Sequence, residues 1–301
     1  MITDRPNARM PVRCTYCHEV ISEASWFADP PEPSAPWFRP TSARQITDIA
    51  ADLGLELTWL SDGWVVRLRR DAVVRHVIGY AFPPNSAVAA HLAADKVGCF
   101  AVLENAGIPA VPHRIVRAGS YGAEELYSAV AQAHELPLVL KPNDGDGGVD
   151  VYRADTPTDL RRILAHMFDR YRAIAIAPFV EGAEEYRVVM LNGTAFPIYR
   201  KLRSLADDCV AEWRNNLRHG ARPELVRNSA LKSQLTILGR RAMDTLGLMF
   251  ASVDILLVDG GFRILEVNSS VCFERFSGFG PGNYHIAYCV YREALRQEFH
   301  R

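Results

Sequence analysis

The stretch VDILLVDGGFRILEVNSS, residues 253–270, places three polar side chains inside two apolar runs. The runs are rich in branched aliphatic residues and flank an Asp-Gly-Gly turn, which predicts a β-hairpin. If residues 259–261 form a three-residue loop, Asp254 lies directly opposite Glu266. Asn268 is two residues further on and shares that face of the sheet. Two carboxylates and an amide are therefore expected to converge in a largely buried sheet.

Such a convergence needs a physical reason. Two neighbouring carboxylates repel each other and lose hydration unless a positive charge lies between them. Oxygen ligands without histidine or cysteine suit a hard cation, Mg²⁺ or Mn²⁺, which also holds substrate phosphates. The alternatives are a hydrogen-bonded polar cluster without metal, or another strand register that turns one carboxylate outward. The hairpin alone leaves these interpretations open.

The overall composition excludes several classes of function. The chain has 301 residues, of which 49% are apolar and 23% charged, with a formal net charge of -1. Bulk charge therefore indicates neither a nucleic-acid partner nor a membrane surface. No apolar run is long enough for a signal peptide or a spanning helix. Six cysteines are too sparse for a disulfide scaffold. These features predict a cytoplasmic protein.

One cysteine pair has a suggestive spacing. The run Cys14-Thr-Tyr-Cys17-His18 could attach haem or supply half of a zinc site. It has no second ligand pair with metal spacing, and two ordinary thiols are the preferred interpretation.

The order of predicted elements divides the chain into three parts. Residues 1–90 hold a proline-rich connector, a helix and a hairpin, and form a small α/β region. Residues 91–184 include the order β-α-β-β-α-β, which describes a compact α/β subdomain. Residues 185–301 are β-rich and hold a long helix, expected over 224–246, and a final helix. The predicted fold class is α/β, or α+β.

A glycine-rich loop follows a strand in VLKPNDGDGGVDV, residues 139–151. Glycine lets backbone N–H groups approach an anion closely, and Lys141 adds a charge. The loop is neither a Walker A motif nor a Rossmann fingerprint. A calcium site at Asp144, Asp146 and Asp150 is an alternative, although the twelve-residue loop ending in glutamate is absent. Taken alone, an ordinary surface loop is the simplest interpretation.

Three other segments could contact a nucleotide. Asp95-Lys96 lies at a predicted helix start, where charge and the helix dipole favour a phosphate. The strand over 173–180 and its connector could offer backbone groups to adenine, and Glu185 a carboxylate to ribose. The span 199–221 collects arginines, whose planar forks suit carboxylates and phosphates. Each feature singly also fits a plain role: a surface lysine, a strand end or a solvated basic face.

The motifs together resemble the ATP-grasp superfamily. Their order is DKVGCFAVLENAGIPAVP, VLKPNDGDGGVDV, IAPFVEGAEEYRVVMLNG, WRNNLRHGA and VDILLVDGGFRILEVNSS, within about residues 85–270. Through WRNNLRHGA and EVNSS the chain is most similar to the branch of ribosomal-protein glutamate ligases and cyanophycin-type ligases. The resemblance implies two α/β subdomains that sandwich ATP, with Mg²⁺, or Mn²⁺ in its place, as cofactor.

The resemblance also assigns roles to individual residues. Two lysines on the phosphates, a glycine loop that closes over them, an adenine hinge and a ribose carboxylate form the ATP set: Lys96, Lys141, Gly145, Gly147, Gly148, Phe179, Val180, Glu181 and Glu185. The implied catalytic residues are Arg214, which would hold the transferred phosphate, its neighbour Asn216, and Arg187. The implied metal ligands are Asp254, Glu266 and Asn268.

Two departures from the family pattern concern the acceptor. After EVN the related ligases continue with a small residue and Pro-Gly, whereas this chain reads Ser269-Ser270-Val271-Cys272. The first 85 residues show no counterpart of the usual substrate-binding first domain. The identity of the acceptor therefore stays open.

The implied reaction transfers the γ-phosphate of ATP to a carboxylate, and an amine then displaces the phosphate. We predict an ATP-dependent carboxylate–amine ligase for a small amino-acid or peptide-like substrate, joining two molecules or closing a ring as the cycloserine-forming ligase does. A role in antibiotic biosynthesis and a homo-oligomer are compatible with this prediction. A nucleotide-binding regulator without turnover and a phosphotransferase to a non-carboxylate acceptor are the alternatives.

Overall fold

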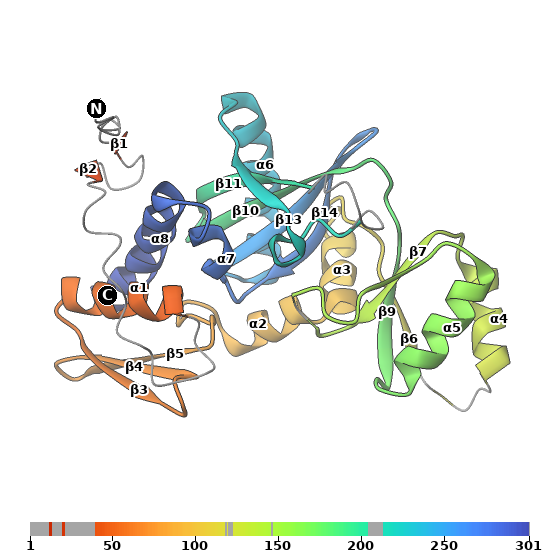
Figure 1. The fold of residues 1–301 in the computed structure, drawn as a ribbon, viewed down its shortest axis with the longest axis horizontal. Coiled ribbons are helices and arrows are strands. Elements are labelled where there is room, and N and C mark those ends of the chain that lie inside the picture. The colour runs from red at the N-terminus through yellow and green to blue at the C-terminus, as the bar shows by residue number, and fades with distance from the viewer. Residues whose placement is uncertain are drawn as a thin grey trace, which may run out of the picture. The chain divides into compact units, whose positions relative to one another are not determined.

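A computed structural model describes residues 12–13, 20–21, 40–117, 119, 123–145, 147–203 and 213–300 (Figure 1). Cys14, Cys17 and His18 lie outside the described residues. The chain separates into two compact units, Met1–Pro83 with Cys272–Arg301, and Pro84–Val271. The three-part division expected from the sequence stays a prediction. The two units differ from it in grouping the C-terminal helix with the N-terminal region.

The first unit packs helices on one face of a small sheet. Besides the short pair β1 (Val12–Arg13) and β2 (Val20–Ile21), it contains α1 (Pro40–Asp52), β3 (Glu56–Leu60), β4 (Val65–Arg70), β5 (Val73–Ile78), α7 (Glu274–Ser277) and α8 (Pro281–Phe299). The strands β3, β4 and β5 are antiparallel in that order, which confirms the predicted hairpin and adds a third strand.

The start of α1 is stabilised by a residue distant in sequence. The helix begins at Pro40, and Ser42 is buried within it. The Glu274 carboxylate accepts hydrogen bonds from the backbone N–H of Thr41 (3.2 Å) and Ser42 (2.9 Å) and from the Ser42 hydroxyl (2.8 Å). A residue distant in sequence therefore satisfies the first-turn donors that a local cap would otherwise serve.

The described part of the second unit contains two sheets. The smaller one, called the lid sheet below, lies in a segment with the predicted β-α-β-β-α-β order: β6 (Arg114–Arg117), α4 (Ala123–Ala133), β7 (Leu138–Pro142), β8 (Tyr152–Ala154), α5 (Pro157–Phe168) and β9 (Ala173–Pro178). The antiparallel strands lie in the order β6-β9-β7-β8. Leu138, Leu140 and Ile176 pack against α5 residues such as Ile163, so the helices cover one face. Lys141 follows Leu140 along β7, so its side chain lies on the other face of the sheet.

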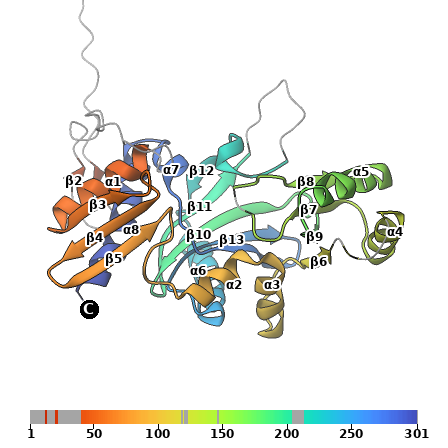
Figure 2. The same cartoon turned by 90° about the horizontal axis from the view of Figure 1, so that it is seen from below.

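The larger central sheet carries the hairpin. Its antiparallel strands lie in the order β12 (Arg222–Leu225), β11 (Thr194–Leu202), β10 (Glu184–Leu191), β13 (Phe250–Val258) and β14 (Gly261–Asn268). Helices α2 (Ala87–Ala94), α3 (Lys96–Asn105) and α6 (Ser229–Leu246) lie on one side of it (Figure 2). Val188, Val253 and Ile255 belong to the core on this helical side. Because side chains alternate along a strand, the residues between them face the opposite side.

The long helix is shorter than the sequence predicted. Glu224 and Leu225, expected to begin the helix, instead belong to β12, which pairs with β11. The helix starts after Asn228, whose side chain accepts from the Leu231 N–H at 2.9 Å. It ends at Gly247 with φ 68°, as expected.

The decisive hairpin has the predicted pairing but a different turn. Val258 pairs with Gly261 across a two-residue turn, so the expected three-residue loop is wrong. A β-bulge between Asp254 and Ile255 shifts the register by one residue and restores the pair Asp254–Glu266. The two carboxylates are therefore opposed, as predicted. Asn268 pairs with Ser252 two residues further along.

Candidate active site

A buried charge network lies on the side of the central sheet opposite its helices. Arg187 binds Asp254 through two hydrogen bonds, Nε to Oδ1 and Nη2 to Oδ2, each 2.7 Å long. Lys201 Nζ donates to Asp254 Oδ2 at 2.9 Å and also to Glu185. Asp254, Lys201 and Glu185 are all less than a tenth exposed. The network joins β10, β11 and β13 through charged hydrogen bonds, which are stronger than neutral ones.

The charges in this network shift each other's protonation. Burial acts to raise the pKa of Asp254, but Arg187 and Lys201 hold it well below the usual range of a carboxyl. Burial also raises the pKa of Glu185, only partly offset by Lys201. Asp254 is therefore firmly ionised, and Glu185 is the member that takes up a proton more readily.

The two lysines expected on phosphates come from different elements. Lys96 begins α3, where its ammonium donates to the carbonyl oxygens of Asn143 (3.4 Å) and Gly145 and lies 3.7 Å from Glu266 Oε1. Lys141 is on β7, opposite Ala175 of β9, and faces away from the lid helices. Burial lowers the pKa of Lys141, and Glu266 partly offsets this effect. Both lysines are almost fully buried.

The glycine loop, residues 143–149, contacts the segment that carries the predicted catalytic arginine. Gly147 and Gly148 have φ values of 62° and 74°, which favour glycine. Arg214 Nη1 donates to the Gly148 carbonyl at 3.4 Å. A Cβ atom at Gly148 would lie only 3.3 Å from Asn216 Nδ2 and 3.4 Å from His219 Nε2. The close approach therefore leaves little room for a side chain.

The expected adenine hinge follows β9. The Phe179 N–H donates to the Pro137 carbonyl at 2.9 Å, and the Arg153 guanidinium lies 3.9 Å from the centre of the Phe179 ring. Val180 packs on a small apolar cluster that includes Leu256, whereas Glu181 is exposed. This segment thus has a fixed backbone with one apolar contact surface, which is compatible with a planar base.

The predicted metal ligands fit a hard cation by their chemistry. Among the described residues, no group of three or more His, Cys, Asp and Glu side chains could hold a metal ion by itself. The pair Asp254–Glu266 and the Asn268 amide nevertheless supply oxygen donors on one face of the sheet. Asp254 accepts three hydrogen bonds, so one of its four lone-pair sites is left. Mg²⁺ suits such a sparse set, because it usually keeps waters and substrate phosphates as further ligands.

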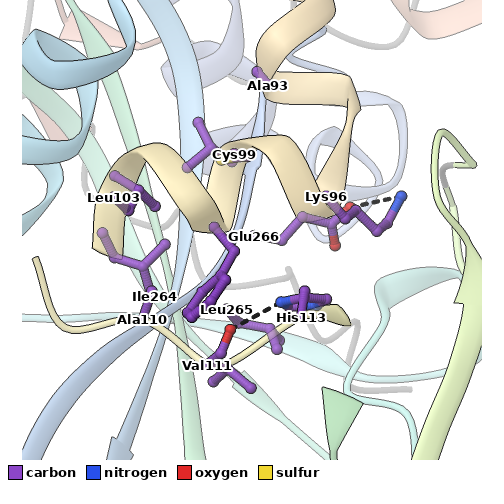
Figure 3. Close-up of a pocket in the computed structure, with 12 residues that line it drawn as sticks. Ala93, Lys96, Cys99, Leu103, Ala110, Val111, His113, Ile264, Leu265 and Glu266 are labelled. Carbon is purple, nitrogen blue, oxygen red and sulfur yellow. Dashed lines mark hydrogen bonds and ion pairs between the residues drawn. The ribbon is translucent and has the colours of Figure 1, made fainter. Parts of the chain in front are cut away.

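Two residues in the site were not singled out from the sequence. Lys201 was only one of several cations in the basic span, and its place between Glu185 and Asp254 depends on the pairing of distant strands. His113 is 2% exposed and lines a pocket with Lys96 and Glu266 (Figure 3). Its Nδ1 lies 2.9 Å from the Val111 carbonyl, and its Nε2 is buried without a hydrogen-bond partner. Burial first, then Lys141, lowers the pKa of His113 to about 3.

Similarity to solved structures identifies the fold. The structure matches D-alanine–D-alanine ligase from Bacillus anthracis with a TM-score of 0.53, over 71% of each chain and at 20% sequence identity. At this level of identity the match shows a shared fold and nothing further. Together with the family match described next, this likeness shows the ATP-grasp fold.

The sequence places the chain within that fold class. The RimK-like ATP-grasp domain matches residues 93–280, more than half of the chain. The chain belongs to the RimK-like ATP-grasp family, as its resemblance to the ribosomal-protein glutamate ligases implied.

Curated relatives carry related names. A probable alpha-L-glutamate ligase of Pectobacterium carotovorum subsp. carotovorum is 28% identical over 197 residues, which cover 63% of this chain and 59% of that one. A probable alpha-L-glutamate ligase of Thioalkalivibrio sulfidiphilus is 27% identical over 191 residues, covering 63% of this chain and 60% of that protein. The match thus spans about 60% of the length of these relatives.

In the described part of the chain, no helix is long and apolar enough to cross a membrane.

Proposed function

We propose that the protein is an ATP-dependent carboxylate–amine ligase, which activates a carboxylate as an acyl phosphate and then forms an amide-type bond. The observation that carries this proposal is the arrangement around Asp254 and Glu266. These paired carboxylates lie on one sheet face, with Lys201 on Asp254 and Lys96 beside Glu266. Oxygen ligands bordered by lysines suit a magnesium–polyphosphate, whose negative charge needs both.

The proposed reaction solves a leaving-group problem. A carboxylate is a poor electrophile because its leaving group would be oxide. In the first step a carboxylate oxygen attacks the γ-phosphorus of ATP, the bond to ADP breaks, and an acyl phosphate forms. In the second step an amine attacks the acyl carbon, phosphate leaves with the oxygen that joined the two, and the nitrogen loses a proton. The protein need supply no covalent nucleophile.

The side chains would act by position and charge. Lys96 and Lys141 would neutralise phosphate oxygens, and Arg214 would hold the transferred phosphate beside Asn216 and the glycine loop. Arg187 would keep Asp254 ionised and fixed, as its two 2.7 Å hydrogen bonds suggest. Mg²⁺ or Mn²⁺, held by Asp254, Glu266 and Asn268, would supply charge neutralisation on the phosphates.

The adenosine of ATP would lie against the hinge. Phe179, Val180 and Glu181 would border the base, and Glu185 would receive the ribose hydroxyls. In the structure the Glu185 carboxylate accepts a hydrogen bond from Lys201, so it would bind Lys201 and the ribose hydroxyls at the same time. The backbone of the hinge, held by the Phe179 hydrogen bond, would provide the donors and acceptors for adenine.

The substrate proposed is a small amino acid or peptide-like acid. The names of the relatives, probable alpha-L-glutamate ligases, support an amino-acid substrate and an amine acceptor. The amine would belong to a second molecule or, as in ring closure, to the same one. A cytoplasmic location, a homo-oligomer and a role in antibiotic biosynthesis also stay predictions.

The proposal is tested by acid-dependent ADP release. The protein with Mg-ATP would be offered a panel of amino acids and short acidic peptides, with and without hydroxylamine. We expect ADP release to depend on one class of acid, and hydroxylamine to trap the acyl group as a hydroxamate. ATP binding without ADP release for any acid would favour the nucleotide-binding regulator. ADP release to an alcohol acceptor, without hydroxamate formation, would favour a phosphotransferase.

A further inference from the structure

Asp150, the residue just beyond the glycine loop, is held unusually firmly. It has a positive φ of 51°, which is uncommon for a residue with a side chain. Its carboxylate accepts hydrogen bonds from the Tyr171 hydroxyl, from the Tyr152 hydroxyl at 3.1 Å and from Arg170 Nη1 at 2.9 Å. Tyr152 also lies 3.1 Å from His166 Nε2, on α5. One carboxylate thus joins the loop to both β8 and the end of α5.

The carboxylate points away from the side expected to receive nucleotide. Tyr152 pairs with Leu140, and both belong to the core under α4 and α5. Asp150 is two residues before Tyr152, and its carboxylate accepts hydrogen bonds from Tyr152 and Arg170 on the side of the sheet that the helices cover. Lys141, the neighbour of Leu140, faces the opposite side. Asp150 would therefore influence a bound phosphate only through the loop.

These contacts also bear on the calcium alternative for the loop. Both Asp150 oxygens already accept hydrogen bonds, from two tyrosines and an arginine. Such donors compete with a cation for the same lone pairs. Asp146 lies outside the described residues. The contacts of Asp150 therefore favour an anchor over a metal ligand.

The other end of the loop is anchored as well. The Asn143 carbonyl accepts from the Lys96 N–H at 3.1 Å, and its side-chain oxygen accepts from the Val97 N–H at 3.1 Å. The start of the loop, which follows β7, is thus tied to the first turn of α3. Its end is tied to the residues just after α5. Between the anchors, Gly148 is exposed enough to meet Arg214 and Asn216. With its ends fixed, the loop has fewer conformations to lose when it meets a ligand.

We propose that Asp150 is a positioning residue that fixes the C-terminal end of the glycine loop, so that the N–H groups of Gly147 and Gly148 are held ready for the phosphates of ATP. This role rests on the proposed ATP-dependent function. The Tyr171 hydrogen bond holds the pKa of Asp150 below its usual range, which keeps the acceptor ionised. No contact between Asp150 and the nucleotide is required.

The test compares Asp150→Asn with Asp169→Asn, a matched loss of charge at an exposed position nearby. Binding of a non-hydrolysable ATP analogue with Mg²⁺ would be measured by calorimetry, and backbone hydrogen exchange over residues 143–152 with and without the analogue. In the native protein we expect the analogue to slow hydrogen exchange in the loop. Asp150→Asn should weaken analogue binding about tenfold, the effect of one lost charged hydrogen bond, and should abolish this slowing. Asp169→Asn should behave as the native protein.

Milder variants separate positioning from folding. Tyr152→Phe and Tyr171→Phe each remove one donor and are expected to raise the KM for ATP about threefold, with kcat at saturating ATP nearly unchanged. They carry the test if Asp150→Asn does not fold. Native binding and exchange in all three variants would overturn the role of Asp150. Tight analogue binding by the native protein without any acid-dependent ADP release would instead overturn the proposed reaction alone.

Discussion

The two halves of the candidate site are built in opposite ways. On the central sheet, Asp254 and Lys201 are buried and the Arg187 side chain is 24% exposed. Both cations donate to Asp254, at 2.7–2.9 Å. In the glycine loop, the Gly148 carbonyl accepts a longer hydrogen bond, 3.4 Å, from Arg214 Nη1. One half is held by neighbouring strands, and the other by its two ends.

Because of this difference, the strand half is expected to contribute to the stability of the fold, and the loop to adjust its conformation when a ligand binds. Buried charges must be paired in the folded state, so the strand half is already arranged before any ligand arrives. A loop with few buried contacts opens at low free-energy cost and can close over a substrate. We expect loss of the buried charge in the strand half to reduce both stability and activity strongly, and substitutions in the loop to reduce activity with a smaller loss of stability.

The largest effect is expected for Asp254→Asn. The change removes the charged carboxylate that Arg187 and Lys201 share, and leaves Lys201 with Glu185 as its remaining anionic partner. Breaking a buried ion pair in this way costs about 3–5 kcal/mol of stability. Turnover should be abolished as well, because a metal ligand is lost. Chemical denaturation and ADP release measure the two consequences.

Glu266→Gln is the matched control within the same pair. The Glu266 side chain is 24% exposed, and its cation, Lys96, lies at a longer distance of 3.7 Å. We expect activity to disappear, but stability to fall by no more than about 1 kcal/mol. Equal destabilisation by both substitutions would show that the strand half is not specially dependent on Asp254.

A smaller effect is expected for Gly148→Ala in the loop. A side chain at φ 74° is strained by about 1–2 kcal/mol, and its Cβ would press on Asn216 at 3.3 Å. The loop should therefore be displaced, and kcat/KM should fall about ten- to a hundredfold, the range for a small misplacement of a positioned group. Steady-state kinetics with varied ATP measure this change.

Gly193→Ala controls for the backbone strain. Gly193 has the same φ of 74°, in the turn between β10 and β11, and its added Cβ would have only a distant neighbour, Arg240, at 3.9 Å. We expect a similar loss of stability with native kinetics. If Gly193→Ala were as inactive as Gly148→Ala, loss of stability would explain both, and the loop would have no special role.

The smallest effect concerns His113 and pH. Burial keeps this imidazole neutral in the folded protein, with a pKa of about 3 against 6.5 for an ordinary histidine. Between these values the unfolded chain binds the extra proton, so folded stability falls as pH falls. We expect His113→Gln to reduce that slope by roughly 1 kcal/mol per pH unit between pH 6 and 4. An unchanged slope in denaturation curves would contradict a neutral buried His113.

The sequence predicts the local part of this arrangement better than the distant part. Asp254 and Glu266 are opposed as expected even though the turn was counted wrongly, because the bulge in the hairpin offsets the shorter turn. The succession of helices and strands along the chain from β6 to β9 was also predicted, whereas the order of these strands within the sheet was not. Short charged strands such as Arg222–Leu225 carry no such pattern, and the second half of β12 was expected to be helix.

The network around Lys201 shows what sequence periodicity cannot supply. Its partners Glu185 and Asp254 are 16 and 53 residues away, and the register between strands brings them together. His113 is similar, since its burial depends on α3 and β14, which border the same pocket. Local patterns predict which face a side chain takes, but not which distant side chain it meets.

The transfer of an oxygen atom tests the central claim most directly. An acid that supports ADP release would be labelled with ¹⁸O in its carboxylate, and the inorganic phosphate analysed by mass spectrometry. An acyl phosphate keeps a carboxylate oxygen as its bridge, and that oxygen leaves with the phosphate when the amine attacks. We predict one labelled oxygen in each phosphate released. Unlabelled phosphate, formed together with ADP and the amide product, would contradict carboxylate activation by this protein.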